Sequence, residues 1–317
     1  MTTLEEIESE EIEYGSIDGL SRSMMVLLLK SPRLFYKTYM TQEVKDKSSH
    51  AMTQGTLKHM LLLEPEKFEN TVQGLEEILI PKESFAEIKG NLKWRIIEEK
   101  STKGFYSVEE PKSATAKENM LEKLKVLYGT KHVVLPSDYL GIKRQVDALQ
   151  DNPYVKEMLE ANPQKQSEIT LTGTLFDVPV KARLDLLLNE YSIIDYKTTD
   201  KSINPKEFAK DMISNGLDIQ CTLYQLLQSE NLPRPARFLF LLQNNKSYES
   251  IVLEPDHGVY EHGLLRIKEA INIYKHCLEE NEWPEFMSKD TRGYSMTNRD
   301  SLFPLSLPYT TNKGENS

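Results

Sequence analysis

The sequence predicts an α+β fold, with a helical first half, a central mixed sheet that contains an antiparallel hairpin, and helices packed on that sheet. Three observations support this prediction. Apolar residues recur at helical spacing in much of the first half, β-branched residues alternate with polar ones over 167–199, and 257–280 is one long amphipathic stretch. Helices followed by strands with interspersed helices are typical of this class.

The composition is that of an ordinary soluble protein. The chain has 317 residues, 39% of them hydrophobic, enough for a substantial core in one elaborated domain or two small ones. No stretch reaches the ~18 uninterrupted apolar residues of a membrane span, and the apolar run at 24–29 lacks the basic flank of a signal peptide. Two cysteines, Cys221 and Cys277, give no disulfide framework. We therefore expect a cytoplasmic protein that makes no contact with a membrane.

The formal net charge of −10 argues against a protein that coats nucleic acid through overall positive charge. However, much of the negative charge is concentrated at the start of the chain. Residues 1–18 hold six glutamates and one aspartate but no lysine or arginine. Residues 19–317 therefore contain 42 of the 49 acidic residues and all 39 basic ones, which gives them a net charge of −3. This nearly neutral remainder can still contain a local basic channel.

The chain is expected to divide into three segments. Residues 1–20 are expected to form an acidic flexible tail, with a DNA-mimicking or partner-binding role as the alternative. Residues 21–300 are expected to form a single folded domain, in which no internal repeat is found. The polar residues 301–317 are expected to form a loose C-terminal tail.

The first helices have recognisable start signals. Ser21 is an N-cap candidate for a helix that runs to about Lys30. Ser31-Pro32 then caps and starts a second helix, because proline suits the first helical turn. A third helix is predicted over 53–68, with an end near Glu64-Pro65.

The following segment is less regular. Over 70–115 we expect mostly irregular structure, with short strands such as 76–80 and one or two short helices. Helical spacing then predicts a helix over 113–129. Two more helices are predicted within 137–160, separated by Asn152-Pro153.

The second half begins with an antiparallel meander. Its predicted strands are 167–173, 174–188 and 191–199. Helices are then predicted over 204–214 and 219–230, and strands over 236–244 and 248–255. The last element is a long helix over 257–280. Its expected apolar positions are 260, 264, 265, 271 and 274.

Three charged residues interrupt the apolar hairpin at 181–199. Asp195 and Lys197 share one face of their strand, with Ile194 and Tyr196 on the other. A two-residue turn would put Asp185 on the opposite face from Asp195. An odd loop, either 189–191 or 188–192, would bring the two aspartates directly opposite each other, and Asn189 can take the left-handed conformation that such a loop needs. We expect the odd register because the hairpin would then present both carboxylates to one metal site.

Two opposed carboxylates about 5 Å apart repel each other unless a cation lies between them. Oxygen ligands without thiolates suit Mg²⁺ or Mn²⁺. Such an ion polarises a phosphoryl oxygen and supplies hydroxide, and Lys197 can orient or deprotonate the attacking water. The pattern therefore indicates metal-assisted phosphodiester hydrolysis. The alternative is that Asp195–Lys197 and Asp185–Arg183 are surface ion pairs, since D-x-K alone is common.

"RLD" at 183–185 and "DYK" at 195–197 resemble the core of the PD-(D/E)XK nuclease fold. The spacing of the motifs along the rest of the chain resembles the RecB-type branch of that superfamily. Within this branch it resembles the RecE-like (exonuclease VIII) phage exonucleases, and the match extends over about residues 21–280. Four further matches follow the order of that family: 23–36, "GTLKH" at 55–59, "SEITLTG" at 167–173 and "DIQCTLYQLL" at 218–227. The acidic position before x-K is often Glu in this family, and Asp195 stays within the motif.

The resemblance implies a role for each matched position. Asp185 and Asp195 would be metal ligands, with the Tyr196 main-chain carbonyl completing the site, and Lys197 would be the catalytic lysine. His59 would be the additional metal ligand of the exonuclease branch, or otherwise a buried core histidine.

The remaining matches would surround this centre. Glu168 would belong to the catalytic group through a metal-bound water, or would form a structural ion pair. Gln220 and Tyr224, one helical turn apart, would lie near the lysine and the DNA, although Tyr224 could instead simply pack on the sheet. Arg183 would contact phosphate, or pair with Asp185 or Glu168.

The resemblance also implies an activity. We expect an exonuclease that uses Mg²⁺, with Mn²⁺ as a substitute, and digests linear double-stranded DNA from the 5′ end to leave 3′ overhangs. Cys221 and Cys277 are too few for the iron–sulfur cluster of some relatives. A single-strand annealing protein would use the overhangs in DNA recombination, in the cytoplasm of a bacterium that carries the phage or prophage. The enzyme would be a ring-like homo-oligomer, such as a tetramer. Two alternatives remain, an endonuclease or single-strand nuclease of the same fold, and a catalytically inactive acidic DNA mimic or scaffold.

Overall fold

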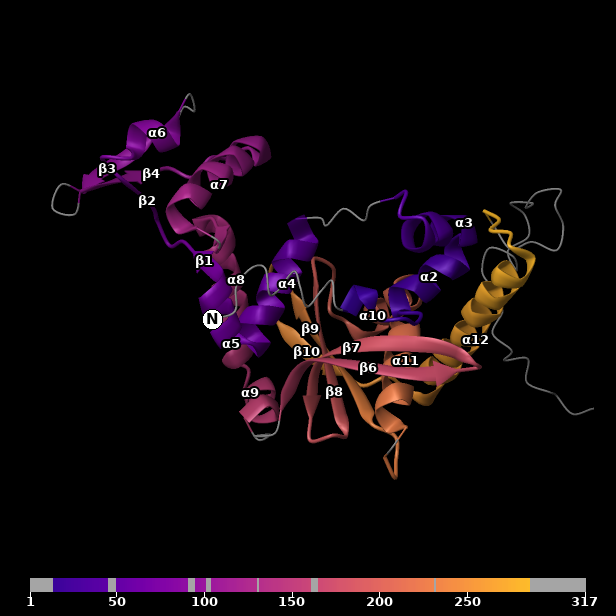
Figure 1. Ribbon diagram of the computed structural model, residues 1–317. Helices are drawn as coiled ribbons and strands as arrows, with labels where there is room; N and C mark the ends of the chain where they lie inside the picture. The colour runs from indigo at the N-terminus through magenta and orange to yellow at the C-terminus, as the bar shows by residue number, and fades with distance from the viewer. Residues whose placement is uncertain are drawn as a thin grey trace, which may run out of the picture.

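The computed structural model describes residues 14–44, 50–90, 95–100, 104–129, 131–160, 165–230 and 232–285. Its largest sheet has five strands in the order β10-β9-β8-β7-β6 (Figure 1). These strands are β6 Gln166–Leu175, β7 Val178–Leu188, β8 Ser192–Thr199, β9 Arg237–Asn244 and β10 Ser250–Leu253. β8 and β9 pair in parallel, and the other neighbours pair antiparallel. The sheet is therefore mixed, and the predicted α+β fold is confirmed.

A three-residue loop, 189–191, joins β7 to β8. The pairs at the base of the hairpin are Leu186–Ile194, Leu187–Ile193 and Leu188–Ser192. Asn189 and Glu190 have φ of 44° and 63°, in the left-handed region that this loop needs. The predicted odd loop is confirmed, and its register makes Asp185 and Asp195 the next opposed position.

β7 and β8 diverge at this position. Their ladder ends at Leu186–Ile194. Beyond it, β7 no longer pairs with β8 and continues beside β6, and β8 continues beside β9 as far as Thr199. The two aspartates therefore lie at a fork in the sheet, where one strand pair becomes two separate pairs.

Beyond the fork, the free edge of β7 is covered by the segment that precedes the first long helix. Leu20 forms a parallel bridge with Val180 and is buried. Lys181 is 2% exposed. Its Nζ donates to the carbonyls of Tyr14, Gly15 and Ile17, at 2.9, 3.3 and 2.6 Å. Packed structure therefore begins by Tyr14, earlier than the expected start at Ser21, while 1–13 and 301–317 lie outside the described residues.

Helices cover both faces of the sheet (Figure 1). The first face carries α2 Arg22–Lys30, α10 Pro205–Ser214, α11 Leu217–Ser229 and α12 His257–Glu280. The second face carries α4 His50–Leu63, α8 Pro136–Gln150 and α9 Pro153–Glu160. Ile193 packs toward the first group, and Ile194 and Tyr196 pack toward the second. In the described residues, no helix combines the length and apolar character needed to cross a membrane.

The predicted start signals of the early helices are confirmed. The Ser21 and Ser31 hydroxyls accept hydrogen bonds from the backbone N–H groups three residues later, at 3.4 and 3.1 Å. The second helix is α3 Pro32–Phe35, continued by a π-helical turn over Tyr36–Met40. The third is interrupted at Glu64, where α4 ends and α5 Pro65–Thr71 begins.

Residues 70–115 are more regular than expected. β2 Ile78–Pro81, β4 Phe105–Val108 and β3 Ile96–Lys100 form a three-stranded antiparallel sheet in that order. A short helix, α6 Phe85–Lys89, and α7 Ala114–Tyr128 share a small core with it. β3 gave no strand signal, because its sequence "IIEEK" is short and three of its five residues are charged. A second small sheet pairs β1 Val72–Gly74 with β5 His132–Val134 in parallel.

The long helix α12 has the predicted bounds, and of its five expected apolar positions only Leu265 is exposed. Leu265, an expected apolar contact, is 52% exposed, whereas Ile267 and Ala270 are fully buried. The backbone of α12 approaches α11 closely at Gly263, since a Cβ there would be 2.3 Å from the Asp218 carbonyl oxygen. This close backbone approach sets which stripe of the helix is buried, and leucine spacing alone does not reveal it.

Candidate functional site

A pocket of about 600 Å³ opens at the fork between β7 and β8. Eight of the nine residues predicted for the site line it: His59, Glu168, Arg183, Asp185, Tyr196, Lys197, Gln220 and Tyr224. The ninth, Asp195, is completely buried beside the pocket, where it contacts Lys197 and Gln220. The structure therefore brings together residues that come from α4, three strands and α11.

Asp195 is held by two donors. Its Oδ1 accepts hydrogen bonds from Lys197 Nζ at 2.9 Å and from Gln220 Nε2 at 2.6 Å, and Nζ is 2.8 Å from Oδ2. Burial raises the pKa of the Asp195 carboxyl, and Lys197 opposes this only in part. For Lys197, burial favours the neutral amine, but Asp195 and Asp185 outweigh it and hold the pKa above its ordinary value. The lysine is therefore charged at neutral pH.

Asp185 faces the helix α4. Its Oδ2 accepts a hydrogen bond from the Tyr196 backbone N–H at 2.9 Å and lies 3.4 Å from His59 Nδ1. Burial lowers the pKa of His59, although the Asp185 charge acts in the opposite direction. The imidazole is therefore neutral at pH 7, the form that binds metals.

Tyr196 is anchored on both sides. Its ring lies 5.0 Å from that of His59, and its hydroxyl donates to Gln243 Oε1 at 2.6 Å. Gln243 is fully buried and donates in turn to the carbonyls of Gln145 and Tyr248, at 2.9 and 3.2 Å. The buried Gln243 therefore holds Tyr196, and with it the strand β8 that carries Asp195, in a fixed position.

Glu168 and Arg183 form the ion pair that was one of the alternatives, with 3.1 Å between Nε and Oε2. Burial and then the Asp185 charge raise the pKa of Glu168 to about 7. Glu168 also has a φ of 51°, and the β6–β7 ladder skips it and Asp185. The Glu168 carboxylate therefore lies next to Asp185, where the β6–β7 pairing is interrupted.

The donor set suits a divalent metal ion. One ligand atom from each of His59, Glu168 and Asp185 lies within 4.8 Å of the others. Asp195 Oδ2 is buried, with Lys197 Nζ 2.8 Å away, so Lys197 already balances this carboxylate and its place among the ligands is what the resemblance implies. Carboxylates with one imidazole fit Mg²⁺ or Mn²⁺, and the imidazole favours Mn²⁺ of the two. The resemblance implies His59, Asp185, Asp195 and the Tyr196 carbonyl as metal ligands, and the structure adds the Glu168 carboxylate as a candidate ligand.

Gln220 and Tyr224 project from α11 toward the sheet. Gln220 reaches Asp195, as described above, rather than open solvent. Tyr224 is 8% exposed, and its ring lies 6.1 Å from that of Phe238. Tyr224 therefore packs on the sheet, which was the alternative given for it from the sequence. It also lines the pocket.

Tyr14, Arg22 and Lys67 are among the pocket residues that were not anticipated from the sequence. Arg22 is the first residue of α2, where the helix dipole disfavours a positive charge. That mismatch is a signal that could have marked it as functional. Tyr14 lies in the segment that we expected to be a tail, and its ring is 5.0 Å from the Arg183 guanidinium.

A mixed sheet that forks at an aspartate and a D-x-K motif, with helices on both faces, defines the PD-(D/E)XK nuclease fold. The chain also matches a family model over residues 21–289, described as a PDDEXK-like domain of unknown function (DUF3799). This match covers most of the chain, and the protein belongs to that family.

One of two similar solved structures supports this fold. A provisionally named exonuclease from Eubacterium rectale is similar at 13% identity and a TM-score of 0.55, over 90% of each chain. A phage-related exonuclease from Haemophilus somnus is 14% identical over 55% of this chain and 92% of its own, with a TM-score of 0.29. No curated protein matches the chain. At this level of identity, the first likeness supports the fold alone.

Proposed function

We propose that the protein is a divalent-metal-dependent deoxyribonuclease that digests linear double-stranded DNA from its ends. One observation carries the proposal. Asp185, Asp195 and Lys197 meet at the fork of a PD-(D/E)XK hairpin, with His59 beside them in the same pocket. This arrangement supplies metal ligands and a charged lysine at one point.

The charges of the pocket favour an anionic substrate once a metal is bound. Four cations line it: Arg22, Lys67, Arg183 and Lys197. Four carboxylates oppose them: Glu64, Glu168 and Asp185 in the lining and the buried Asp195. The formal sum is zero, and a divalent ion would make it +2. Metal binding and phosphate binding should therefore reinforce each other.

The chemistry is hydrolysis of a phosphodiester. A bond forms between a water oxygen and phosphorus, one phosphorus–oxygen ester bond breaks, and the leaving oxygen takes up a proton. A bound divalent ion would polarise a phosphoryl oxygen and acidify water. His59, Glu168 and Asp185 would hold it, with Asp195 as the further ligand that the resemblance implies. Lys197 stays protonated, so it would orient the water and offset charge on the phosphoryl oxygens rather than act as a base.

The finer features of the proposal rest on the resemblance to RecE-like exonucleases. They are Mg²⁺ as the metal, 5′ to 3′ digestion that leaves 3′ overhangs, and a single-strand annealing partner in recombination. A ring-shaped homo-oligomer and action in the cytoplasm of a phage-carrying bacterium belong to the same proposal. The exonuclease name of the Eubacterium rectale structure is consistent with digestion from ends.

The test is a digestion time course on linear duplexes labelled at the 5′ or the 3′ end, with covalently closed circles in parallel. With Mg²⁺ we expect nucleotide release from the linear duplex and an intact circle, and no release in EDTA. Asp195→Ala should abolish release. Lys201→Ala is the matched control, because Lys201 is an exposed lysine paired with Asp211 outside the pocket, and it should keep wild-type activity.

Each alternative predicts a different result. Cutting of the closed circle would replace the exonuclease by an endonuclease, and release from single strands alone would indicate a single-strand nuclease. Equal nucleotide release from wild type and Asp195→Ala would show that the release does not come from this site, and would favour the alternative of a catalytically inactive scaffold with this fold.

A further inference from the structure

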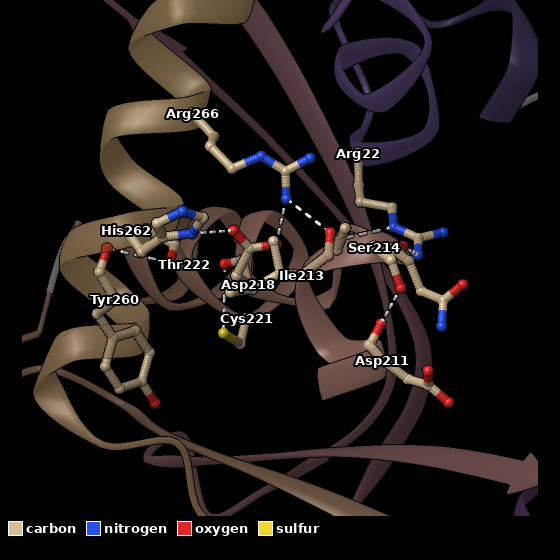
Figure 2. Close-up of polar contacts among 12 residues, drawn as sticks. Arg22, Asp211, Ile213, Ser214, Asp218, Cys221, Thr222, Tyr260, His262 and Arg266 are labelled. Atoms are coloured by element: carbon tan, nitrogen blue, oxygen red, sulfur yellow. Dashed lines mark hydrogen bonds and ion pairs between the residues drawn. The ribbon is translucent and has the colours of Figure 1, made fainter. Parts of the chain in front are cut away.

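A second charged group lies on α11 and α12, outside the pocket lining (Figure 2). Asp218, in the first turn of α11, is 1% exposed. Arg266 Nη1 donates to its Oδ1 at 2.7 Å, and His262 Nδ1 lies 2.7 Å from its Oδ2. Both partners come from α12, four residues apart and thus on one face of that helix. Each oxygen of the buried carboxylate therefore has a directional partner.

The same contacts hold the turn that precedes α11. Arg266 Nη1 also donates to the Ile213 carbonyl at 2.9 Å. Arg22 approaches from α2, and its guanidinium donates to the carbonyls of Gly216, at 3.3 Å, and Asn215. Figure 2 shows the two arginines converging on this turn from different helices. Gly216 has a φ of 67°, which an L side chain rarely adopts, so the turn is fixed in both conformation and position.

Backbone contact between the helices leaves little freedom to slide. A Cβ at Gly263 would lie 2.2 Å from Thr222 Oγ1 and 2.3 Å from the Asp218 carbonyl oxygen. Thr222 Oγ1 also donates to the Tyr260 carbonyl at 3.4 Å. The first two turns of α11 are therefore seated directly against α12.

Gln220 connects this arrangement to the pocket. It follows Asp218 by two residues, which is about 200° of rotation around the helix at 3.6 residues per turn. Asp218 thus points to α12, while Gln220 points to β8, where its Nε2 reaches Asp195 Oδ1 at 2.6 Å. A small rotation of α11 that loosens Asp218 would displace Gln220 in the opposite direction.

We propose that Asp218, His262 and Arg266 are positioning residues, which fix the rotation of α11 and so aim Gln220 at Asp195. An apolar contact in their place would tolerate rotation, whereas a carboxylate with a directional partner at each oxygen accepts one orientation. The effect on DNA hydrolysis rests on the proposed function. The effect on the metal site does not require that function.

The test measures Mn²⁺ binding by calorimetry and, separately, DNA hydrolysis. Asp218→Asn keeps the size of the side chain and one acceptor oxygen but removes the charge. We expect the Kd for Mn²⁺ to rise about 10- to 100-fold, as for other groups that orient ligands, and kcat to fall while KM for DNA changes little. Ile271→Val is the matched control, since it trims a fully buried side chain of α12 outside this group and should keep the wild-type Kd.

A double-mutant comparison separates positioning from general destabilisation. If Asp218 acts through Gln220, Asp218→Asn should change the Kd less than about twofold in a Gln220→Ala background. An equal loss in both backgrounds, or a wild-type Kd in Asp218→Asn, would overturn the proposal. If Asp218→Asn does not fold, His262→Ala replaces it, and His262→Gln, which keeps an N–H donor, should restore most of the affinity.

The two proposals can fail independently. A wild-type protein that binds Mn²⁺ but releases no nucleotide would refute the proposed function, and the Kd comparison would still decide the role of Asp218.

Discussion

Replacing Glu168 by glutamine should stabilise the metal-free protein at pH 8. Glu168 is packed between Asp185 and Arg183, and burial followed by the Asp185 charge raises its pKa from 4.5 to about 7. Glutamine has nearly the same size and keeps an oxygen that can accept from Arg183. However, it has no charge to bury beside Asp185, so the variant avoids a cost that the wild type bears at high pH.

The size of the effect follows from proton linkage. Because the pKa is higher in the folded state, the unfolded chain holds fewer protons between pH ~4.5 and 7, and the free energy of unfolding falls as the pH rises through this window. At ~1.36 kcal/mol per pH unit, a rise from 4.5 to about 7 corresponds to at most about 3 kcal/mol. With an unfolding entropy of ~2.1 cal/mol/K per residue, this is a shift in Tm of roughly 4–5 °C for 317 residues.

The assay is thermal unfolding followed by circular dichroism in EDTA, at pH 5.5 and pH 8. The Tm advantage of Glu168→Gln over wild type should grow between the two pH values, and Mn²⁺ should remove it by stabilising the wild type more. Glu157→Gln, at an exposed position on α9, is the control and should match wild type at both pH values. A variant that is less stable than wild type at pH 8, or a difference that does not change with pH, would refute the reasoning.

Three further predictions concern the neighbours of this group. His59→Ala should weaken Mn²⁺ binding at least about tenfold in calorimetry while the protein stays folded, and unchanged binding and activity would make His59 a core residue only. Tyr196→Phe removes the donor to the buried Gln243 Oε1 and should cost about 1–3 kcal/mol in urea unfolding, whereas an unchanged midpoint would show that the amide finds another donor. Gly263→Ala places a methyl against the Asp218 carbonyl and should cost about 1–3 kcal/mol by overpacking, and wild-type stability would show that α12 can move away freely.

Local rules were sufficient to predict the centre of the site. The period of two along a strand put Asp195 and Lys197 on one face, and the expected pairing of Asp185 with Asp195 required the odd loop that the structure contains, with Asn189 at positive φ. The motif resemblance added His59 and Gln220, which the structure places within reach of the two aspartates. These features depend on the spacing of residues along one segment or on a short motif.

The parts that were missed depend on contacts between distant segments. Arg22 bonds to the carbonyl of Gly216, 194 residues away, and no pattern within either segment indicates this pairing. Tyr14 was assigned to the tail because its neighbours are acidic, yet Lys181 binds its carbonyl oxygen from β7. The cluster of Glu168 with His59 and Asp185 similarly requires a break in the β6–β7 ladder, which alternation along the strand does not predict.

The fork in the sheet divides the candidate metal site between two strand pairs. Asp185 and Glu168 belong to the β6–β7 ribbon, whereas Asp195 and Lys197 belong to the β8–β9 pair. The ribbon ends in a turn at Phe176–Asp177, where α12 contacts it through Lys268 over the Phe176 ring and a 3.5 Å ion pair from Lys275. Twisting the ribbon would therefore change the spacing between the carboxylates of the two strand pairs. A displacement of the turn at Phe176–Asp177, far from the pocket, would therefore change the affinity of the candidate site for a metal ion.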